Sequence, residues 1–160
     1  MTGYARAMLT TTHRSAGAML ALVLVACSDP PDETALGRDA AKVLARSEQD
    51  VPKVKLQHVL LAFVGATRGS ESGHTMEEAR ALTSDVLARA RAGEDFTALV
   101  TQYNTSDEQP GIFVLTQDDR EDYAEHFADI GFRLQVGEIG VAPYHRVKSP
   151  FGWHVIKRLE

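Results

Sequence analysis

The chain has 160 residues, 44% of them hydrophobic, with 17 basic and 22 acidic side chains and a formal net charge of −5. This acidic balance argues against nucleic acid and anionic lipid headgroups as partners, because both require clustered positive charge. One cysteine excludes an internal disulfide, and the sequence holds no zinc-type Cys/His cluster, P-loop or dinucleotide-type glycine motif, so we expect no metal and no cofactor.

The first 27 residues have the layout of a secretory signal. They carry Arg6 and Arg14 and no acidic residue, and the apolar run over 16–25 is too short for a permanent membrane span. The run leads into Leu-Val-Ala-Cys27, which resembles a bacterial lipobox, where the cysteine is acylated and becomes the first mature residue. The alternative is an ordinary signal with an incidental cysteine. Losing both arginines with the leader changes the net charge from −5 to −7.

Residues 28–50 begin with Ser-Asp-Pro-Pro-Asp-Glu, a polar and turn-forming stretch. We predict a flexible tether here, leading to a single domain over 51–160. The alternative is a short helix over 36–44, but its apolar face is thin. Ser28 follows the acylated cysteine, and by resemblance to Gram-negative sorting signals this favours the outer membrane. The expected location is therefore the cell envelope, with the domain lipid-anchored and facing the periplasm.

Strand and helix patterns alternate along the domain. A strand is predicted over 53–63, followed by a loop over 65–74 that is rich in glycine and serine. Thr75 has Glu78 three residues later, which predicts a capping box at the start of a helix, and Gly93 is a typical helix end.

Shorter elements follow. Asp95 is a predicted cap for a second helix, whose apolar face would carry Phe96, Leu99, Val100 and Tyr103. We further predict a strand over 112–115, a helix over 121–130 that ends near Gly131, and strands over 141–147 and 154–159. A few strands with helices packed outside them form an α+β fold.

Two histidines stand where a strand would normally carry an aliphatic residue. His58 shares its parity with Val54, Leu56 and Leu60, so it should point with them toward the interior. His154 begins another β-rich run and shares its parity with an apolar neighbour. Two inward imidazoles in one small domain predict a central polar pair.

Four segments occur in the order and approximate spacing of a known family. They are His58-Val59-Leu60, Gly93-Glu94-Asp95-Phe96 leading to Tyr103-Asn104, Phe127 leading to Phe132-Arg133-Leu134 and Gly137-Glu138-Ile139, and Phe151-Gly152-Trp153-His154-Val155-Ile156. Together they resemble the parvulin-type peptidyl-prolyl cis-trans isomerases over 51–160. The resemblance implies a four-stranded antiparallel sheet, with the two histidine strands central and helices around it.

The resemblance also implies roles for the polar residues. His58 and His154 would lie close together, hydrogen-bond with neighbouring hydroxyls, and shape and polarise the catalytic site. Ser149, five residues before His154, would orient that ring. The same hydrogen bonds suit a histidine pair that only stabilises the sheet, so both interpretations stay open.

Four apolar residues are candidates for substrate binding by the same resemblance. Phe127 matches the floor of the family's proline pocket, and Tyr123, four residues earlier on the same predicted helix face, matches a second pocket position. Ile112 is a candidate for the aliphatic wall, and Phe132 matches a core aromatic residue. Ordinary core packing is the alternative for all four.

One part of the chain departs from the family. Members carry an acidic or thiol residue after the Tyr-Ser stretch; here Ser106 aligns with it and Asp107 comes one residue late. Both are candidates for the catalytic polar cluster. The loop that follows is also shorter than in the family. These departures favour a rival hypothesis, in which the domain binds extended chains as a chaperone without catalysis.

The substrate class follows from charge. Phosphate-selective members use an Arg and Lys cluster after the first strand, where this chain offers only Arg68. Acidic residues crowd the predicted approach to the pocket and would repel a phosphopeptide; they are Asp118, Asp119, Glu121, Asp122 and Glu125. We therefore expect an isomerase for non-phosphorylated X-Pro bonds in unfolded or newly exported proteins.

Overall fold

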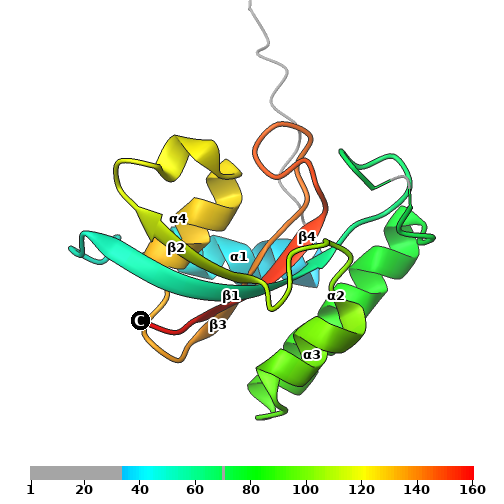
Figure 1. Ribbon diagram of the computed structural model, residues 1–160, viewed down its shortest axis with the longest axis horizontal. Coiled ribbons are helices and arrows are strands. Elements are labelled where there is room, and N and C mark those ends of the chain that lie inside the picture. The colour runs from blue at the N-terminus through cyan, green and yellow to red at the C-terminus, as the bar shows by residue number, and fades with distance from the viewer. Residues whose placement is uncertain (1–33, 70) are drawn as a thin grey trace, which may run out of the picture.

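Within the residues that this computed structural model describes, 34–69 and 71–160, four antiparallel strands form one sheet in the order β2-β1-β4-β3 (Figure 1). The strands are β1 Lys53–Leu61, β2 Ile112–Thr116, β3 Ile139–Ala142 and β4 Trp153–Arg158. The register pairs His58 with Ile156 and Leu60 with His154. The two histidine strands are therefore central neighbours, and the predicted α+β fold with a four-stranded antiparallel sheet is confirmed.

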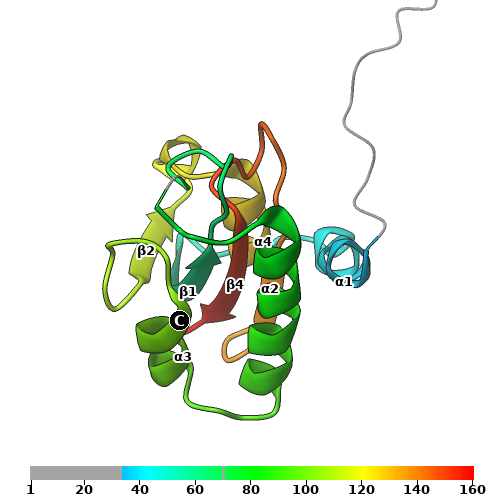
Figure 2. The same ribbon diagram turned by 90° about the vertical axis from the view of Figure 1, so that its right-hand side faces the viewer.

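Helices cover both faces of the sheet (Figure 1 and Figure 2). They are α1 Ala35–Leu44, α2 Met76–Arg91, α3 Phe96–Tyr103 and α4 Glu125–Arg133, with a short 3-10 turn, η1, at Arg120–Asp122. Helix α4 packs on the face that carries His58, and it comes so close that a Cβ at Gly131 would lie 2.4 Å from Leu56. Helices α2 and α3 lie on the opposite face, where Gln57 of β1 donates to Thr97 of α3 at 3.4 Å.

Strand β1 is more buried than its alternation predicted. The pattern placed Lys53, Lys55 and Gln57 on an outer polar face, but Gln57 is buried and the next two residues on that face, Val59 and Leu61, are fully buried. The reason is the cover from α2 and α3, which reaches the second half of the strand. His58 is buried on the face that its parity predicted.

Helix α1 overturns part of the predicted tether over 28–50. From Thr34, whose side chain accepts from the Gly37 amide at 3.3 Å, the chain is helical and belongs to the domain. Leu36, Ala40 and Val43 are buried in the common core, where α1 contacts β3 and α4. The apolar face is narrow, as the sequence indicated, but tertiary burial stabilises it, so the flexible-spacer prediction is wrong for residues 34–44.

Other boundaries hold in part. The Thr75–Glu78 capping box is present at the start of α2, and the Asp95 side chain caps α3. The predicted helix over 121–130 is instead the turn η1, a break, and then α4, which continues past Gly131 because that glycine faces the sheet. The strand predicted over 141–147 ends at Ala142.

The predicted leader, Cys27 and the first residues of the predicted tether lie outside the described residues. Among those that are described, no helix combines the length and the apolar character needed to cross a bilayer.

Candidate active site

Two buried histidines meet at the centre of the sheet. His58 of β1 and His154 of β4 are each 4% exposed, and their Nδ1 atoms lie 3.1 Å apart. A hydrogen bond at this distance needs one Nδ1 to donate and the other to accept, so the two neutral rings must be opposite tautomers. In the accepting ring the proton then lies on Nε2.

Burial keeps this pair uncharged. It lowers the pKa of His58 to about 4. Burial, followed by repulsion from His58, lowers the pKa of His154 well below its ordinary value. Both imidazoles are therefore neutral near pH 7, and the pair offers hydrogen-bonding groups rather than charge.

Hydroxyl groups do not orient the pair as predicted. Neither imidazole Nε2 has a hydrogen-bond partner among the described residues. The Ser149 hydroxyl donates to the Gly152 carbonyl at 3.3 Å instead. Ser149 therefore stabilises the turn before β4, and the prediction that it orients His154 is corrected.

Three aromatic rings surround the histidines. Phe113 of β2 packs edge-on against His58, with ring centroids 4.9 Å apart, and Phe127 of α4 lies 5.3 Å from both imidazoles. Tyr123 follows η1 and lies 6.2 Å from Phe127. Tyr123 and Phe127 thus come together as predicted, but from two separate elements rather than from one helix face.

Phe113 lines the pocket, whereas its neighbour Ile112, which is the predicted aliphatic wall, does not. The register pairs Phe113 with Leu56, on the His58 face of the sheet, so Ile112 points to the opposite face and is 43% exposed. Alternation along β2 shows that Ile112 and Phe113 lie on opposite faces of the sheet. Only the pairing of β2 with β1 shows which of the two faces carries His58.

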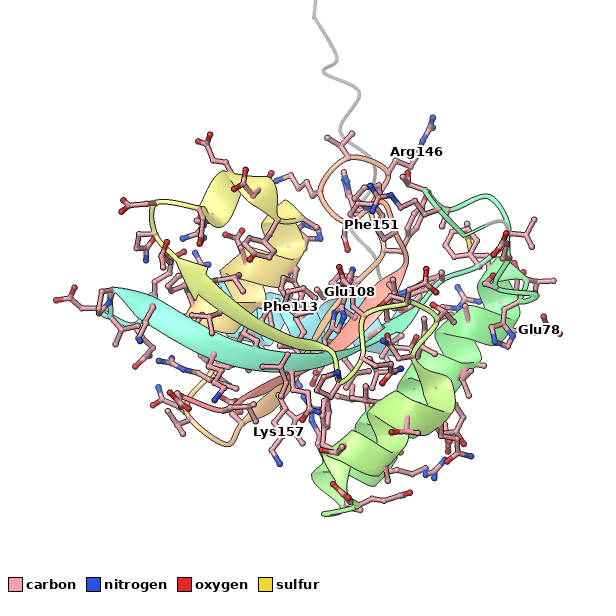
Figure 3. All side chains as sticks on the ribbon, in the orientation of Figure 1. Glu78, Glu108, Phe113, Arg146, Phe151 and Lys157 are labelled. Atoms are coloured by element: carbon pink, nitrogen blue, oxygen red, sulfur yellow. The ribbon has the colours of Figure 1, made fainter. Side chains whose placement is uncertain are left out.

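These groups line a pocket of about 420 Å³. Its lining residues are His58, Leu60, Ala62, Thr67, Arg68, Thr105, Ser106, Asp107, Glu108, Phe113, Asp122, Tyr123, Ala124, Phe127, Phe151 and His154. Figure 3 shows Glu108, Phe113 and Phe151, from three different segments, above the sheet, whereas Lys157 lies below it. The pocket combines an apolar, aromatic wall with a neutral polar floor.

The structure brings together six of the nine predicted site residues. His58, His154, Ser106, Asp107, Tyr123 and Phe127 line the pocket, whereas Ile112, Phe132 and Ser149 do not. Phe132 is fully buried in the core, where the Arg120 guanidinium lies 5.3 Å above its ring. Phe132 is therefore a packing residue in this fold.

Side-chain hydrogen bonds fix the loop that carries Ser106. Asn104 Oδ1 accepts from the Leu60 amide at 2.8 Å, and Asn104 Nδ2 donates to Ser106 Oγ at 3.0 Å. Thr105 Oγ1 donates to the Leu60 carbonyl at 2.9 Å and accepts from the Ala62 amide at 3.0 Å. These two side chains extend the hydrogen bonding of β1 beyond the end of β2 and hold Ser106 at the pocket edge.

Charge at the pocket is mostly negative. Of the five acidic residues predicted at the approach, Asp122 lines the pocket, together with Asp107 and Glu108 from the Ser106 loop. Arg68 lines it as well, with its guanidinium 5.7 Å from the Phe151 ring centre. Across the described ranges, no three His, Cys, Asp or Glu side chains come together as a metal site would require.

Solved structures share this architecture. The solution structure of TbPIN1 matches with a TM-score of 0.55 and 21% identity, covering 68% of this chain and 98% of that chain. The peptidyl-prolyl isomerase ESS1 from Candida albicans matches with a TM-score of 0.54 and 16% identity, covering 71% of this chain and 66% of that chain. At these identities the likeness shows the fold. The comparison with curated proteins gives no match.

The family model of the PPIC-type PPIase domain matches residues 39–160. The matched range begins inside α1 and contains all four motif segments and both histidine strands. It also contains every residue that lines the pocket. The chain therefore belongs to the PPIC-type PPIase family, the parvulins.

Proposed function

We propose that this protein is a peptidyl-prolyl cis-trans isomerase. The observation that carries the proposal is the neutral His58–His154 pair on the floor of a pocket walled by Phe113, Tyr123 and Phe127. Family membership supports the same activity. A rival function is the binding of extended chain without turnover. It would use the same pocket, and the exchange experiment described below distinguishes it from catalysis.

The chemistry suits such a site. Rotation about a prolyl bond needs no covalent intermediate, but amide resonance sets a barrier of roughly 18–20 kcal/mol. An aromatic cup holds the proline ring and removes the carbonyl from water, which disfavours the charge-separated planar amide. The neutral histidine pair that lines the pocket supplies a preorganised polar floor beneath the rotating bond.

The substrates in this proposal are non-phosphorylated X-Pro segments of unfolded proteins. Arg68 is the one Lys or Arg among the described lining residues, and its guanidinium lies over Phe151. Asp107, Glu108 and Asp122 line the same pocket and would repel a phosphate dianion. A phosphate-selective site would need a surplus of cations here.

The proposed location is the cell envelope. The support is the Leu-Val-Ala-Cys27 sequence after a short apolar run, which resembles a lipobox. Acyl chains on Cys27, each stabilised by about 0.8 kcal/mol per buried methylene, would anchor the protein durably in a membrane. The clients would then be exported chains that fold near that membrane.

Two-dimensional NMR exchange on a Ser-Pro peptide and its phosphoserine-Pro counterpart tests both the activity and the substrate class. The full chain should accelerate exchange in the unmodified peptide, and the phosphorylated peptide should respond less. Equal or greater acceleration of the phosphopeptide would contradict the substrate proposal. Pocket binding of both peptides with no acceleration would support the binding-module function.

A further inference from the structure

The mouth of the pocket carries an excess of negative charge. Asp107, Glu108 and Asp122, which we call the acidic rim, all line it, and none of their carboxylates has an ion pair within the described part of the chain. Acidic residues elsewhere are often held by cations, as Glu48 is by Arg120 at 2.7 Å. The charge of the acidic rim is therefore available to a ligand.

Hydrogen bonds hold the backbone of two residues of the acidic rim. Asn104 Nδ2 donates to the Glu108 carbonyl at 3.1 Å, and the Asp122 amide donates to the Asp119 carbonyl at 3.0 Å. Burial is the main cause of a raised pKa of Tyr123, and the negative charges of Asp119, Asp122 and Glu108 raise it further. The field of two residues of the acidic rim, Asp122 and Glu108, therefore reaches the aromatic wall. The backbone that carries Glu108 and Asp122 is thus held in place, and both residues are exposed, so a cation can reach their carboxylates.

The floor of the same pocket has polar groups that lack partners. His58 and His154 are each 96% buried and line the pocket, and neither Nε2 has a hydrogen-bond partner among the described residues. Buried polar atoms without partners are costly, so a ligand with peptide groups would be favoured over these rings. The floor and the acidic rim together fit a polypeptide segment that carries positive charge.

Arg68 only partly offsets the acidic rim. The pocket is lined by this one guanidinium, which lies over Phe151, and by the three carboxylates of the acidic rim. We propose that the acidic rim selects proline segments with Lys or Arg directly beside the proline, an inference that rests on the isomerase function proposed above.

The test compares kcat/KM for peptides that differ at one residue, Lys, Gln or Glu, placed before the proline in one series and after it in another. The full chain should isomerise the Lys peptide of at least one series about threefold to tenfold faster than the Gln peptide at low salt, as expected for a few partly solvated charge pairs. The Glu peptide should be slower than the Gln peptide. In about 0.5 M salt the Lys preference should fall below about twofold, because screening shortens the range of the field.

Glu108→Gln/Asp122→Asn should lower the Lys-to-Gln ratio toward one. Asp50→Asn/Glu77→Gln removes the same charge from exposed positions that do not line the pocket, and it should keep the ratio. The ratio is taken within one variant, so a general loss of activity cancels. A wild-type ratio near one in both series, or equal ratios in the two double variants, would overturn the proposal.

Failure of the proposed function would look different. In that case no peptide would be isomerised by the wild-type chain. NMR titration of the same Lys, Gln and Glu peptides would then still decide the inference, because a basic preference in dissociation constants survives without turnover. Equal dissociation constants for the three peptides would overturn it.

Discussion

His58 and His154 lie with their Nδ1 atoms 3.1 Å apart in a setting that excludes water, and this geometry fixes their charge. Two protonated rings would place two donors face to face, so the folded protein favours the neutral pair. Alternation in the sequence was enough to predict that His58 points inward, because a strand places every second residue on one face. It could not predict the contacts of the rings, which depend on the register of β1 with β4 and of β1 with β2.

The histidine pair should make the protein less stable as the pH falls. The folded-state pKa of His58 is about 4 against an ordinary 6.5, so below pH 6.5 the unfolded chain binds more protons. The stabilisation is complete above pH 6.5 and is lost as the pH falls toward 4. Urea unfolding should show a loss of about 2 kcal/mol from His58 alone between about pH 7.5 and pH 5.

The double variant His58→Leu/His154→Leu removes both partners together and should flatten this dependence. His74→Gln, which changes a histidine outside the pair, should keep it. An equal pH slope in the wild type and the double variant would contradict a neutral buried pair.

Substitutions at two neighbouring residues of β2 compare the face that lines the pocket with the opposite face. Phe113→Ala removes a ring that lines the pocket and should lower kcat/KM at least about tenfold, since an aromatic contact of this size is worth more than about 1.4 kcal/mol. Ile112→Ala, on the opposite face, should leave kcat/KM within about twofold of the wild type, in line with a small effect at an exposed position. Thermal melts check that both variants are folded. Equal losses would mean that β2 does not present Phe113 to substrate.

At the scale of elements, local signals gave the helix caps of α2 and α3, because capping depends on residues three or four apart. The start of α4 was not predictable in this way. Tyr123 follows the 3-10 turn, and Ala124 separates it from the helix of Phe127. The two rings also pack around Phe113 of β2, which no local signal in the sequence could show. Helix α1 was not predictable from local signals either, because its narrow apolar face is stabilised by packing against β3 and α4.

The contribution of α1 to the domain can be measured. Leu36→Ala removes a side chain that is 3% exposed and should lower the free energy of unfolding by about 2–5 kcal/mol. Lys42→Ala, on the exposed side of the same helix, should change it by less than about 0.5 kcal/mol. Chemical denaturation of both variants provides the comparison. A negligible effect of Leu36→Ala would show that α1 is not part of the cooperative unit.

At the scale of the whole molecule, four short motifs in order indicated the fold through their resemblance to the parvulins. The domain limits were less predictable. The core includes residues from Leu36 onward, so the domain begins close to Cys27 in sequence. Fully extended, residues 28–34 span at most about 25 Å, so a lipid on Cys27 would keep the start of α1 within about that distance of the bilayer.

Anchoring is tested by Cys27→Ser. The variant cannot accept an acyl chain, so it should move from the membrane fraction to the soluble fraction of the cell envelope. Ser28→Ala changes the neighbouring residue and should stay with the membranes. Membrane retention of Cys27→Ser would contradict the lipid anchor.

Catalysis itself is the central claim, and NMR exchange between the cis and trans signals of an Ala-Pro peptide tests it most directly. Without a catalyst this exchange takes tens to hundreds of seconds. We expect the full chain to accelerate it in proportion to protein concentration, and Phe113→Ala to remove most of the acceleration. A folded wild-type chain whose pocket signals shift with peptide while the exchange rate stays unchanged would contradict the account and leave a binding module.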